Sequence, residues 1–282
     1  MIGYNCAYLR HYYPKEFLVA YMNNMENEDD ISNATNLARI KGIEIKNPKF
    51  GIFNTDYSIK NGIIYKGLRS IKYVSDDCIN DLSKLDNVIY TTFYDLYKDI
   101  KEKCSINSRQ IFALTIIDYF KDFGKTKKIL DFIEYFDIIY KKKQIKKEKC
   151  NEFLTSIIKP ISSETNTQYN DFDYDKVLYE VWNKLEDVEI DIHEQIKYQL
   201  EYMGYISVEI PKGISIATVD VVSSKNAWVK LISARDNKEA WFCFDKKPKK
   251  NDIIKFTSQD IEVKKSDYRR DVKFIKKYEI IK

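Results

Sequence analysis

The sequence predicts an α+β protein whose N-terminal two thirds are mostly helical, with one small hairpin, followed by a small barrel of five strands. Apolar residues recur at intervals of three and four along most of the first 206 residues, which is the spacing of amphipathic helices. From Gly213 onward they alternate with polar residues, as in strands with one buried face. With 282 residues, 44% hydrophobic and 32% charged, the chain is long enough for two or three compact units.

Two helices and a hairpin are predicted near the start. Residues 14–21 begin with a proline, which is tolerated in a first helical turn, and residues 30–41 begin with acidic residues and end at a glycine. Residues 56–66 alternate around an Asn-Gly pair, which is typical of a two-residue hairpin turn. The helical spacing predicts further helices over residues 76–85, 92–103, 108–121, 125–141, 174–185 and 193–203.

Two stretches between these helices are expected to be irregular. Residues 141–150, KKKQIKKEKC, have the composition of an exposed helix end followed by a linker. Residues 162–173, SSETNTQYNDFD, are polar and are expected to form a flexible loop.

Five short strands separated by polar turns are predicted after Gly213. Their segments are ISIATVDVV, AWVKLISA, EAWFCF, DIIKFTS and VKFIKKYEII. Five strands in about 70 basic residues suit a small Greek-key barrel of the OB type, although an SH3-like barrel has the same pattern.

Composition argues against disulfide-bonded and metal-dependent proteins. The five cysteines lack Cys-x-x-Cys spacing, and the two histidines, His11 and His193, are far apart. These patterns favour a reducing compartment and predict no metal site. No apolar run approaches the roughly 20 residues that cross a bilayer, and the start lacks a signal-peptide pattern. We therefore expect a cytoplasmic protein without a cofactor or a membrane partner.

Positive charge is concentrated in the last quarter of the chain. Residues 207–282 hold 18 Lys and Arg against 11 Asp and Glu, whereas the whole chain has a formal net charge of only +4. This excess favours a polyanionic partner for the last quarter, and a solvated basic surface is the alternative.

The first 75 residues carry a family pattern. The segments MIGYNCAYLRHYYPKEFLVAYMNN, ARIKGIEIKNP and TDYSIKNGIIYKGLRSIKYVS follow one another in this order. They resemble the C-terminal part of bacterial DnaE-type DNA polymerase III alpha subunits. The matching residues are Tyr4, Ala7, Tyr8, Leu9, Tyr13, Pro14, Glu16, Phe17, Gly62, Ile64, Gly67, Leu68, Ile71 and Lys72. Weaker similarity extends along nearly the whole chain, as in EQIKYQLEYMGYISVEIP.

The resemblance implies four segments. Residues 1–65 resemble the end of the fingers with a hairpin, and residues 66–150 resemble a helical helix-hairpin-helix region that grips duplex DNA. Residues 151–206 resemble a linker and two helices with a clamp-binding motif, and residues 207–282 an OB-like barrel near the template strand. In the family the polymerase active site is an acidic set on the palm, upstream of the matching part. The resemblance therefore implies no catalytic residue in this chain.

The resemblance also places a phosphate-binding hairpin after Gly67. A helix-hairpin-helix binds phosphate through backbone N–H groups at a tight turn, which in the family is Gly-hydrophobic-Gly. Here Tyr73 and Ser75 replace the two glycines and two aspartates follow at once, so a structural remnant is the alternative to a working site. The side chains expected to contact DNA are those of Lys66, Arg69 and Lys72.

Two more groups of residues are candidate DNA contacts. The first, Lys141, Lys142, Lys143, Lys146 and Lys147, would bind the DNA backbone by charge alone, and a solvated helix end is the alternative. The second combines aromatic and cationic residues, as in OB domains that bind single strands, although strand aromatics also form cores. Its members are Trp228, Lys230, Tyr268, Arg269, Arg270 and Lys273.

One segment partly matches a clamp-binding peptide. In QYNDF, Gln168 supplies the first residue and Phe172 the apolar anchor, but Asp171 stands where the family has an apolar residue. Burying that charge would be costly.

Acidic pairs do not predict catalysis. Phosphoryl transfer by two metal ions needs at least two fixed carboxylates. Asp29-Asp30 and Asp76-Asp77 stand where helices are predicted to begin, where carboxylates are favoured for capping, and DFDYD at residues 171–175 falls in a predicted loop.

Two functions therefore remain open. The first is a non-catalytic subunit that binds single- or double-stranded DNA without sequence preference, either as an accessory or as one half of a split replicative polymerase. In the split case, DNA would be polymerised only together with an upstream half. The second is an interaction protein derived from a polymerase, for example in a mobile element, that binds or inhibits a host polymerase or sliding clamp.

Overall fold

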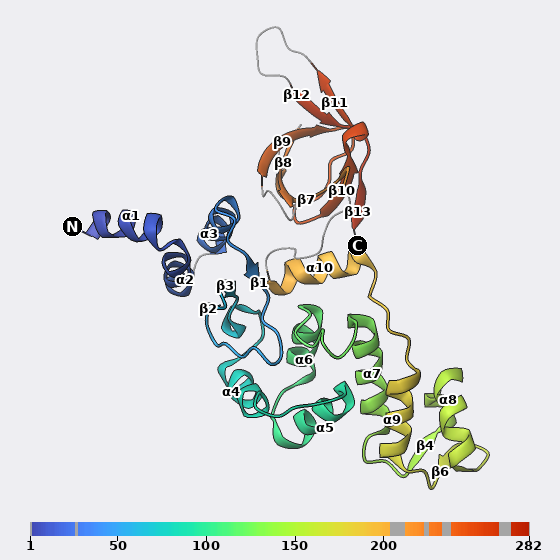
Figure 1. Cartoon of the computed structure of the whole chain (residues 1–282). Helices are drawn as coiled ribbons and strands as arrows, with labels where there is room; N and C mark the ends of the chain where they lie inside the picture. Colours follow the sequence, from blue (N-terminus) through green and yellow to red (C-terminus); the bar gives the residue numbers. More distant parts are fainter. Residues whose placement is uncertain are drawn as a thin grey trace. The chain divides into compact units, whose positions relative to one another are not determined.

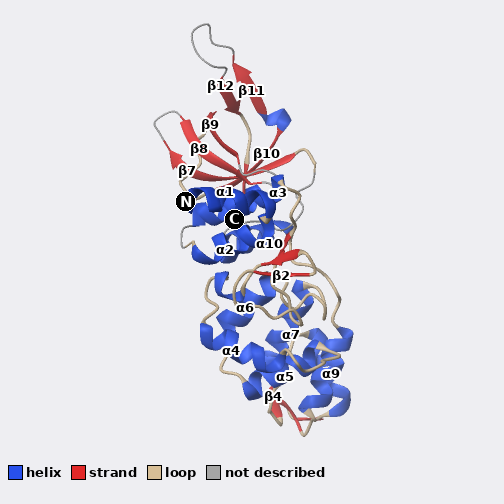
Figure 2. Ribbon diagram, turned by 60° about the vertical axis from the view of Figure 1, so that its left-hand side comes forward, coloured by secondary structure: helices blue, strands red, loops and turns tan. Residues whose placement is uncertain are grey.

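The computed structural model describes residues 2–25, 28–203, 212–222, 226–232, 238–264 and 272–281, and confirms the predicted α+β class. The chain divides into two compact units (Figure 1). Unit 1 comprises Met1–Asn47, Asn54–Lys72 and Asp191–Lys282, and unit 2 comprises Pro48–Phe53 and Tyr73–Ile190. Unit 2 is mostly helical, whereas the last part of unit 1 is a β-sheet (Figure 2). No described helix is long and apolar enough to span a membrane.

Three helices open unit 1, namely α1 (Ile2–Tyr12), α2 (Pro14–Asn24) and α3 (Glu28–Ile40). α2 and α3 confirm the predicted helices at these positions. They pack through Leu18, Met22, Ala34 and Ala38, which are all buried. α1 was not predicted, because residues 3–12 are all exposed and a helix without a buried face leaves no periodic apolar pattern.

The predicted hairpin is confirmed. β2 (Ser58–Lys60) and β3 (Ile63–Tyr65) pair in antiparallel fashion, and Asn61 and Gly62 have φ angles of 52° and 76°, as a type I′ turn requires. β1 (Ile45–Lys46) pairs with β3 in parallel.

The sheet of unit 1 has seven described strands where five were predicted. Its order is β11-β12-β9-β8-β7-β10-β13. The strands are β7 (Ile214–Val222), β8 (Asn226–Ile232), β9 (Lys238–Phe244), β10 (Ile253–Thr257), β11 (Ile261–Lys264), β12 (Val272–Ile275) and β13 (Glu279–Ile281). β11 was missed, and the predicted last strand is broken into β12 and β13 at residues 276–278. The described strands pair in one order from β11 to β13, which does not by itself show the predicted five-stranded barrel.

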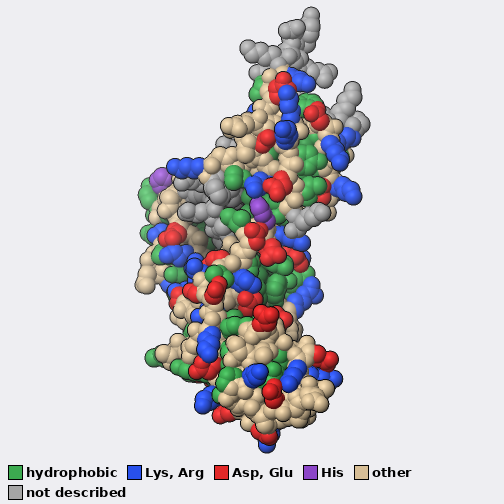
Figure 3. Space-filling model, turned by 90° about the vertical axis from the view of Figure 1, so that its right-hand side faces the viewer, with side chains coloured by type: hydrophobic (Ala, Val, Ile, Leu, Met, Phe, Trp, Pro, Cys, Tyr) green, Lys and Arg blue, Asp and Glu red, His purple; other side chains and the backbone are tan. Residues whose placement is uncertain are grey.

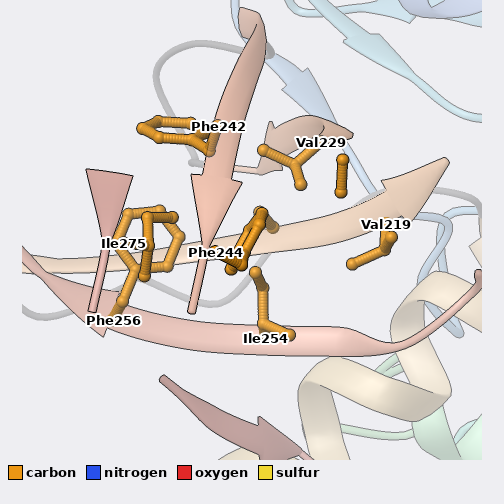
Figure 4. Close-up of a cluster of buried hydrophobic side chains, with 9 residues drawn as sticks. Val219, Val229, Phe242, Phe244, Ile254, Phe256 and Ile275 are labelled. Carbon is orange, nitrogen blue, oxygen red and sulfur yellow. The ribbon is translucent and has the colours of Figure 1, made fainter. Parts of the chain in front are cut away.

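The core of this sheet lies on the face that carries Phe242 and Phe244. Both rings are buried against Val219, Val229 and Ile254, as Figure 4 shows. The phenylalanines of AWFCF therefore belong to the core. α10 (Ile192–Met203) adds a second cluster, in which Ile196 packs with residues of β7 and β13.

Unit 2 is built from helices that, except for α7 (Thr126–Ile139), begin at a side-chain cap. They are α4 (Asp76–Leu85), α5 (Phe93–Lys103), α6 (Ser108–Ile116), α7 (Thr126–Ile139), α8 (Glu152–Ile158) and α9 (Tyr174–Lys184). The side chains of Ser75, Thr92, Asn107, Asn151 and Asp173 accept hydrogen bonds from N–H groups of the following first turn. α6 ends five residues earlier than predicted, because the chain turns at Asp118, whose φ is 64°.

Two predictions for unit 2 are wrong. The lysine tract is not a helix end, since α7 stops at Ile139 and β4 (Gln144–Lys146) follows. The predicted flexible loop contains β5 (Ser163–Glu164) and β6 (Gln168–Asn170), which form a sheet in the order β4-β6-β5. Strands of two or three residues are too short to show an alternating pattern.

Candidate nucleic-acid interface

Gly67 allows two segments of unit 1 to cross at very short range. A Cβ atom on Gly67 would lie 2.4 Å from both the Cα of Asp56 and the carbonyl oxygen of Thr55. Around this crossing, the N–H groups of Leu68 and Arg69 donate to the carbonyls of Asn54 (3.1 Å) and Thr55 (3.0 Å). The crossing fixes the backbone that leads into the predicted phosphate-binding turn.

The three predicted cations of this region have different surroundings. Lys66 is only 4% exposed, and its Nζ donates to the carbonyl of Met203 at 3.3 Å, which does not favour the predicted contact of Lys66 with DNA. The sequence gives no sign that the Lys66 ammonium is buried or that a distant backbone carbonyl accepts its hydrogen bond. Arg69 is exposed and forms an ion pair with Asp56 at 3.0 Å. Lys72 is exposed at its side chain, while its N–H donates to the carbonyl of Tyr202 (3.1 Å).

The turn itself keeps a glycine-like conformation without the glycine. Tyr73 has a φ of 70°, a region that a bulky side chain enters at a cost of about 1 kcal/mol or more. The guanidinium carbon of Arg109 lies 3.5 Å from the centre of the Tyr73 ring, and this stacking holds the turn. Ser75 caps α4, and Asp76 and Asp77 occupy its first turn. Carboxylates at these positions oppose a bound phosphate, which favours the structural-remnant interpretation.

The lysine tract lies beside acidic side chains. Lys141, Lys146 and Lys147 form ion pairs with Glu102 (3.5 Å), Glu148 (3.3 Å) and Glu164 (3.0 Å), respectively. Lys142 donates to the carbonyl of Ile138 (2.6 Å) near the end of α7, and Lys143 is exposed. Exposed pairs of this kind are worth little, but they lower the net field that a phosphate meets. On the described face shown in Figure 3, basic and acidic side chains are interspersed.

The predicted barrel contacts are only partly described. Lys273 is exposed on β12, where it pairs with Val263 of β11. Trp228 and Lys230 belong to β8, but their side chains lie outside the described part of the structure. Tyr268, Arg269 and Arg270 lie outside the described residues.

The predicted clamp-binding segment is folded into a sheet. Gln168 pairs with Lys146 in the β4–β6 ladder, and Phe172 is only 5% exposed. Asp171 adopts a φ of 57° and accepts a hydrogen bond from the hydroxyl of Ser163 (2.7 Å). A clamp-binding peptide must present its apolar anchor to the partner, so the burial of Phe172 does not favour this prediction.

The carboxylates that follow Asp171 have structural partners. Asp173 caps α9 by accepting from the N–H groups of Asp175 and Lys176. Asp175 accepts from the Tyr94 hydroxyl and from Lys98 Nζ at 2.7 Å. Burial of Asp175 opposes its ionisation, but these hydrogen bonds outweigh burial and keep the pKa of the carboxyl below its ordinary value. Among the residues that the structure describes, no three His, Cys, Asp or Glu side chains are grouped to hold a metal.

A basic segment that was not predicted as a contact lies between β9 and β10. We call residues 245–252, DKKPKKND, the lysine loop. Its four lysines, Lys246, Lys247, Lys249 and Lys250, are exposed, whereas Pro248 between them is buried. Four lysines within five residues were visible in the sequence as a signal for a polyanion contact.

No family model matches the chain. The comparisons with curated proteins connect it with DNA polymerases. It is 28% identical over 132 residues to the DNA polymerase III subunit alpha of Bacillus subtilis (strain 168), an alignment covering 46% of this chain and 12% of that protein. Over 126 residues it is 29% identical to the subunit of the same name from Ureaplasma parvum serovar 3, covering 44% and 13%. The matched part spans about an eighth of these relatives, and the relationship to DNA polymerase III subunit alpha is distant.

Proposed function

We propose that the chain is a non-catalytic DNA-binding or accessory protein related to the C-terminal region of DNA polymerase III alpha. The observation behind this proposal is the similarity over nearly half of the chain to two alpha subunits, which favours a polymerase-related role. The basic excess of residues 207–282 favours DNA as the partner of that part. The resemblance implies four segments, the last of them OB-like.

Strand topology supports an OB-like interpretation of the sheet. β10 and β11 are separated only by the single 3-10 turn Ser258–Asp260, so they can be treated as one bent strand. β10 pairs with β7 and β11 with β12, and β12 pairs in parallel with β9. Treated in this way, five strands follow one another around a partly open barrel, which is the OB arrangement. OB domains bind single strands along such sheets.

The test is DNA binding by the whole chain. Fluorescence anisotropy with labelled single-stranded and duplex DNA is expected to detect binding at about 50 mM salt that weakens steeply towards about 200 mM, because phosphate contacts release counterions. Changing Lys230, Arg269 and Arg270 to Ala is expected to weaken binding. The matched control removes three lysines that are ion-paired within their helices, Lys84, Lys103 and Lys184, and is expected to bind like the unchanged chain. Absence of binding at low salt would contradict the proposal.

A second candidate function, binding to a polymerase, is favoured by α1. Tyr4 and Tyr12 are 75% and 62% exposed, and Tyr8 and Leu9 are nearly half exposed on the same helix. Tyrosine is enriched at protein interfaces, because it combines a large apolar ring with a hydroxyl that can remain hydrogen-bonded. This surface suits either an upstream polymerase half or a host polymerase.

A binding assay with a purified polymerase tests this candidate. Sedimentation of the chain with the Bacillus subtilis DNA polymerase III alpha subunit, without DNA, is expected to show a complex. Changing Tyr4 and Tyr12 to Ser is expected to weaken it about tenfold or more, as for interface aromatics in general. The control Tyr179→Ser changes a half-exposed tyrosine of α9 and is expected to have no effect. If the unchanged chain and both variants bound the polymerase equally, or if the unchanged chain did not bind it, α1 would be ruled out as the interface.

A further inference from the structure

The lysine loop is a structured element of unit 1. Its backbone is held at three points: the N–H of Lys249 donates to Asp252 Oδ2 (2.7 Å), the N–H of Asn251 donates to the carbonyl of Val219 (2.7 Å), and the Tyr278 hydroxyl donates to the carbonyl of Lys246 (2.9 Å). Asn251 has a φ of 70°, a conformation that asparagine tolerates better than most residues. The loop therefore has a defined shape.

The anchors of the loop reach the core of the sheet. The Tyr278 ring packs edge-on against Phe244, with their centres 5.6 Å apart. Burial and the nearby Asp252 carboxylate raise the pKa of the Tyr278 phenol, so its hydroxyl remains protonated and able to donate. The buried Pro248 divides the loop into two lysine pairs that both extend into solvent.

Carboxylates accompany both the lysine loop and the lysine tract at residues 141–147. In the tract, three of the five predicted lysines lie against glutamates. In the loop, the Asp252 carboxylate accepts from the backbone N–H of Lys249, and Asp245 is exposed at the start of the loop. Because the loop backbone is already ordered, a ligand that binds its lysines does not have to order that backbone.

We propose that the lysine loop is the principal contact of this protein with the phosphodiester backbone of nucleic acid, binding by charge without sequence preference. This inference rests on the proposed function and assigns the contact to Lys246, Lys247, Lys249 and Lys250. An ordered set of four cations close together suits successive phosphates of one strand, and such contacts make affinity depend strongly on salt.

The experiment compares two variants of the whole chain with the same change in charge. In the first, the four loop lysines are changed to Gln; in the second, Lys141, Lys142, Lys143 and Lys146 are changed to Gln. The probe is a labelled oligothymidine of about 16 nucleotides, the upper site size for one OB fold. Anisotropy is measured between about 50 and 200 mM salt.

The loop variant is expected to bind at least tenfold more weakly at the lowest salt. Its slope of log affinity against log salt is expected to fall by about 3, because each phosphate contact on a single strand contributes about 0.7. The control variant is expected to keep the slope of the unchanged chain. Circular dichroism of both variants verifies that they fold.

Three outcomes would overturn the inference. If the unchanged chain binds and the loop variant keeps its slope, the contact lies elsewhere and the proposed function stands. If the unchanged chain does not bind the oligonucleotide at any salt, the inference fails together with the DNA-binding function. If the loop variant loses only its binding to vesicles of phosphatidylserine and phosphatidylcholine in equal amounts, the loop recognises a lipid surface instead.

Discussion

Changing Gly67 to alanine is expected to destabilise unit 1 by about 3 kcal/mol, the upper end of the range for overpacking. The φ of Gly67 is −77°, so alanine would meet no conformational strain, and the effect is purely steric. The added Cβ would lie 2.4 Å from backbone atoms of Thr55 and Asp56, which cannot rotate away as a flexible side chain can. The two crossing segments must therefore move apart. This movement weakens the hydrogen bonds that the N–H groups of Leu68 and Arg69 donate across the crossing. Urea unfolding monitored by circular dichroism measures the change.

The control for this experiment is Gly3→Ala. Gly3 lies in α1 with nothing within 4 Å of an added Cβ, and alanine has the better helix propensity, so stability is expected to stay equal or rise by up to about 1 kcal/mol. If the Gly67→Ala and Gly3→Ala variants were equally stable, the two segments would not cross at Gly67 as closely as described.

The second large effect is expected at Phe93, where unit 2 concentrates its aromatic core. The ring of Phe93 is fully buried, with centres 5.6 Å from Tyr97, 5.3 Å from Phe120, 6.0 Å from Phe132 and 5.8 Å from Trp182. Changing Phe93 to alanine would remove all of these contacts and leave a cavity among rigid rings. We expect a loss of about 3–5 kcal/mol, measured by thermal or urea unfolding.

Two controls distinguish packing from the loss of any aromatic ring. Phe93→Leu retains most of the volume and is expected to cost less than about 1.5 kcal/mol. Tyr179→Ala removes a half-exposed ring from α9 and is expected to cost less than about 1 kcal/mol. If Phe93→Ala lowered the free energy of unfolding by less than Tyr179→Ala does, the described core would be contradicted.

The helices of unit 2 were predictable because their ends are encoded locally. Thr92, Asn107 and Asp173 are good N-caps, and each stands immediately before the first residue of its helix. The hairpin was predictable for the same reason, since Asn61 and Gly62 adopt the two positive φ angles that its turn needs. In these elements local preference and tertiary packing agree.

The features that were missed depend on contacts distant in sequence. β4 and β6 are three residues each and exist only because residues 144–146 meet residues 168–170. Lys66 is buried because Met203, 137 residues later, supplies its hydrogen-bond acceptor. The spacing of apolar residues around Phe172 and Lys66 does not indicate these distant contacts. The lysine loop was visible as composition, but only the buried Pro248 and the ordered backbone distinguish it from a solvated basic turn.

Unit 1 is discontinuous, and this has a consequence for the order of events during synthesis. The chain leaves unit 1 after Lys72 and returns at Asp191, where α10 supplies the carbonyls that receive Lys72 N–H and Lys66 Nζ. On the ribosome, the residues of unit 2 emerge as a nearly uninterrupted run and can fold at once. The hydrogen bonds that Lys66 Nζ and Lys72 N–H donate to α10 must wait until α10 has been translated. Lys66 therefore stays hydrated while unit 2 folds, and its burial follows the translation of α10.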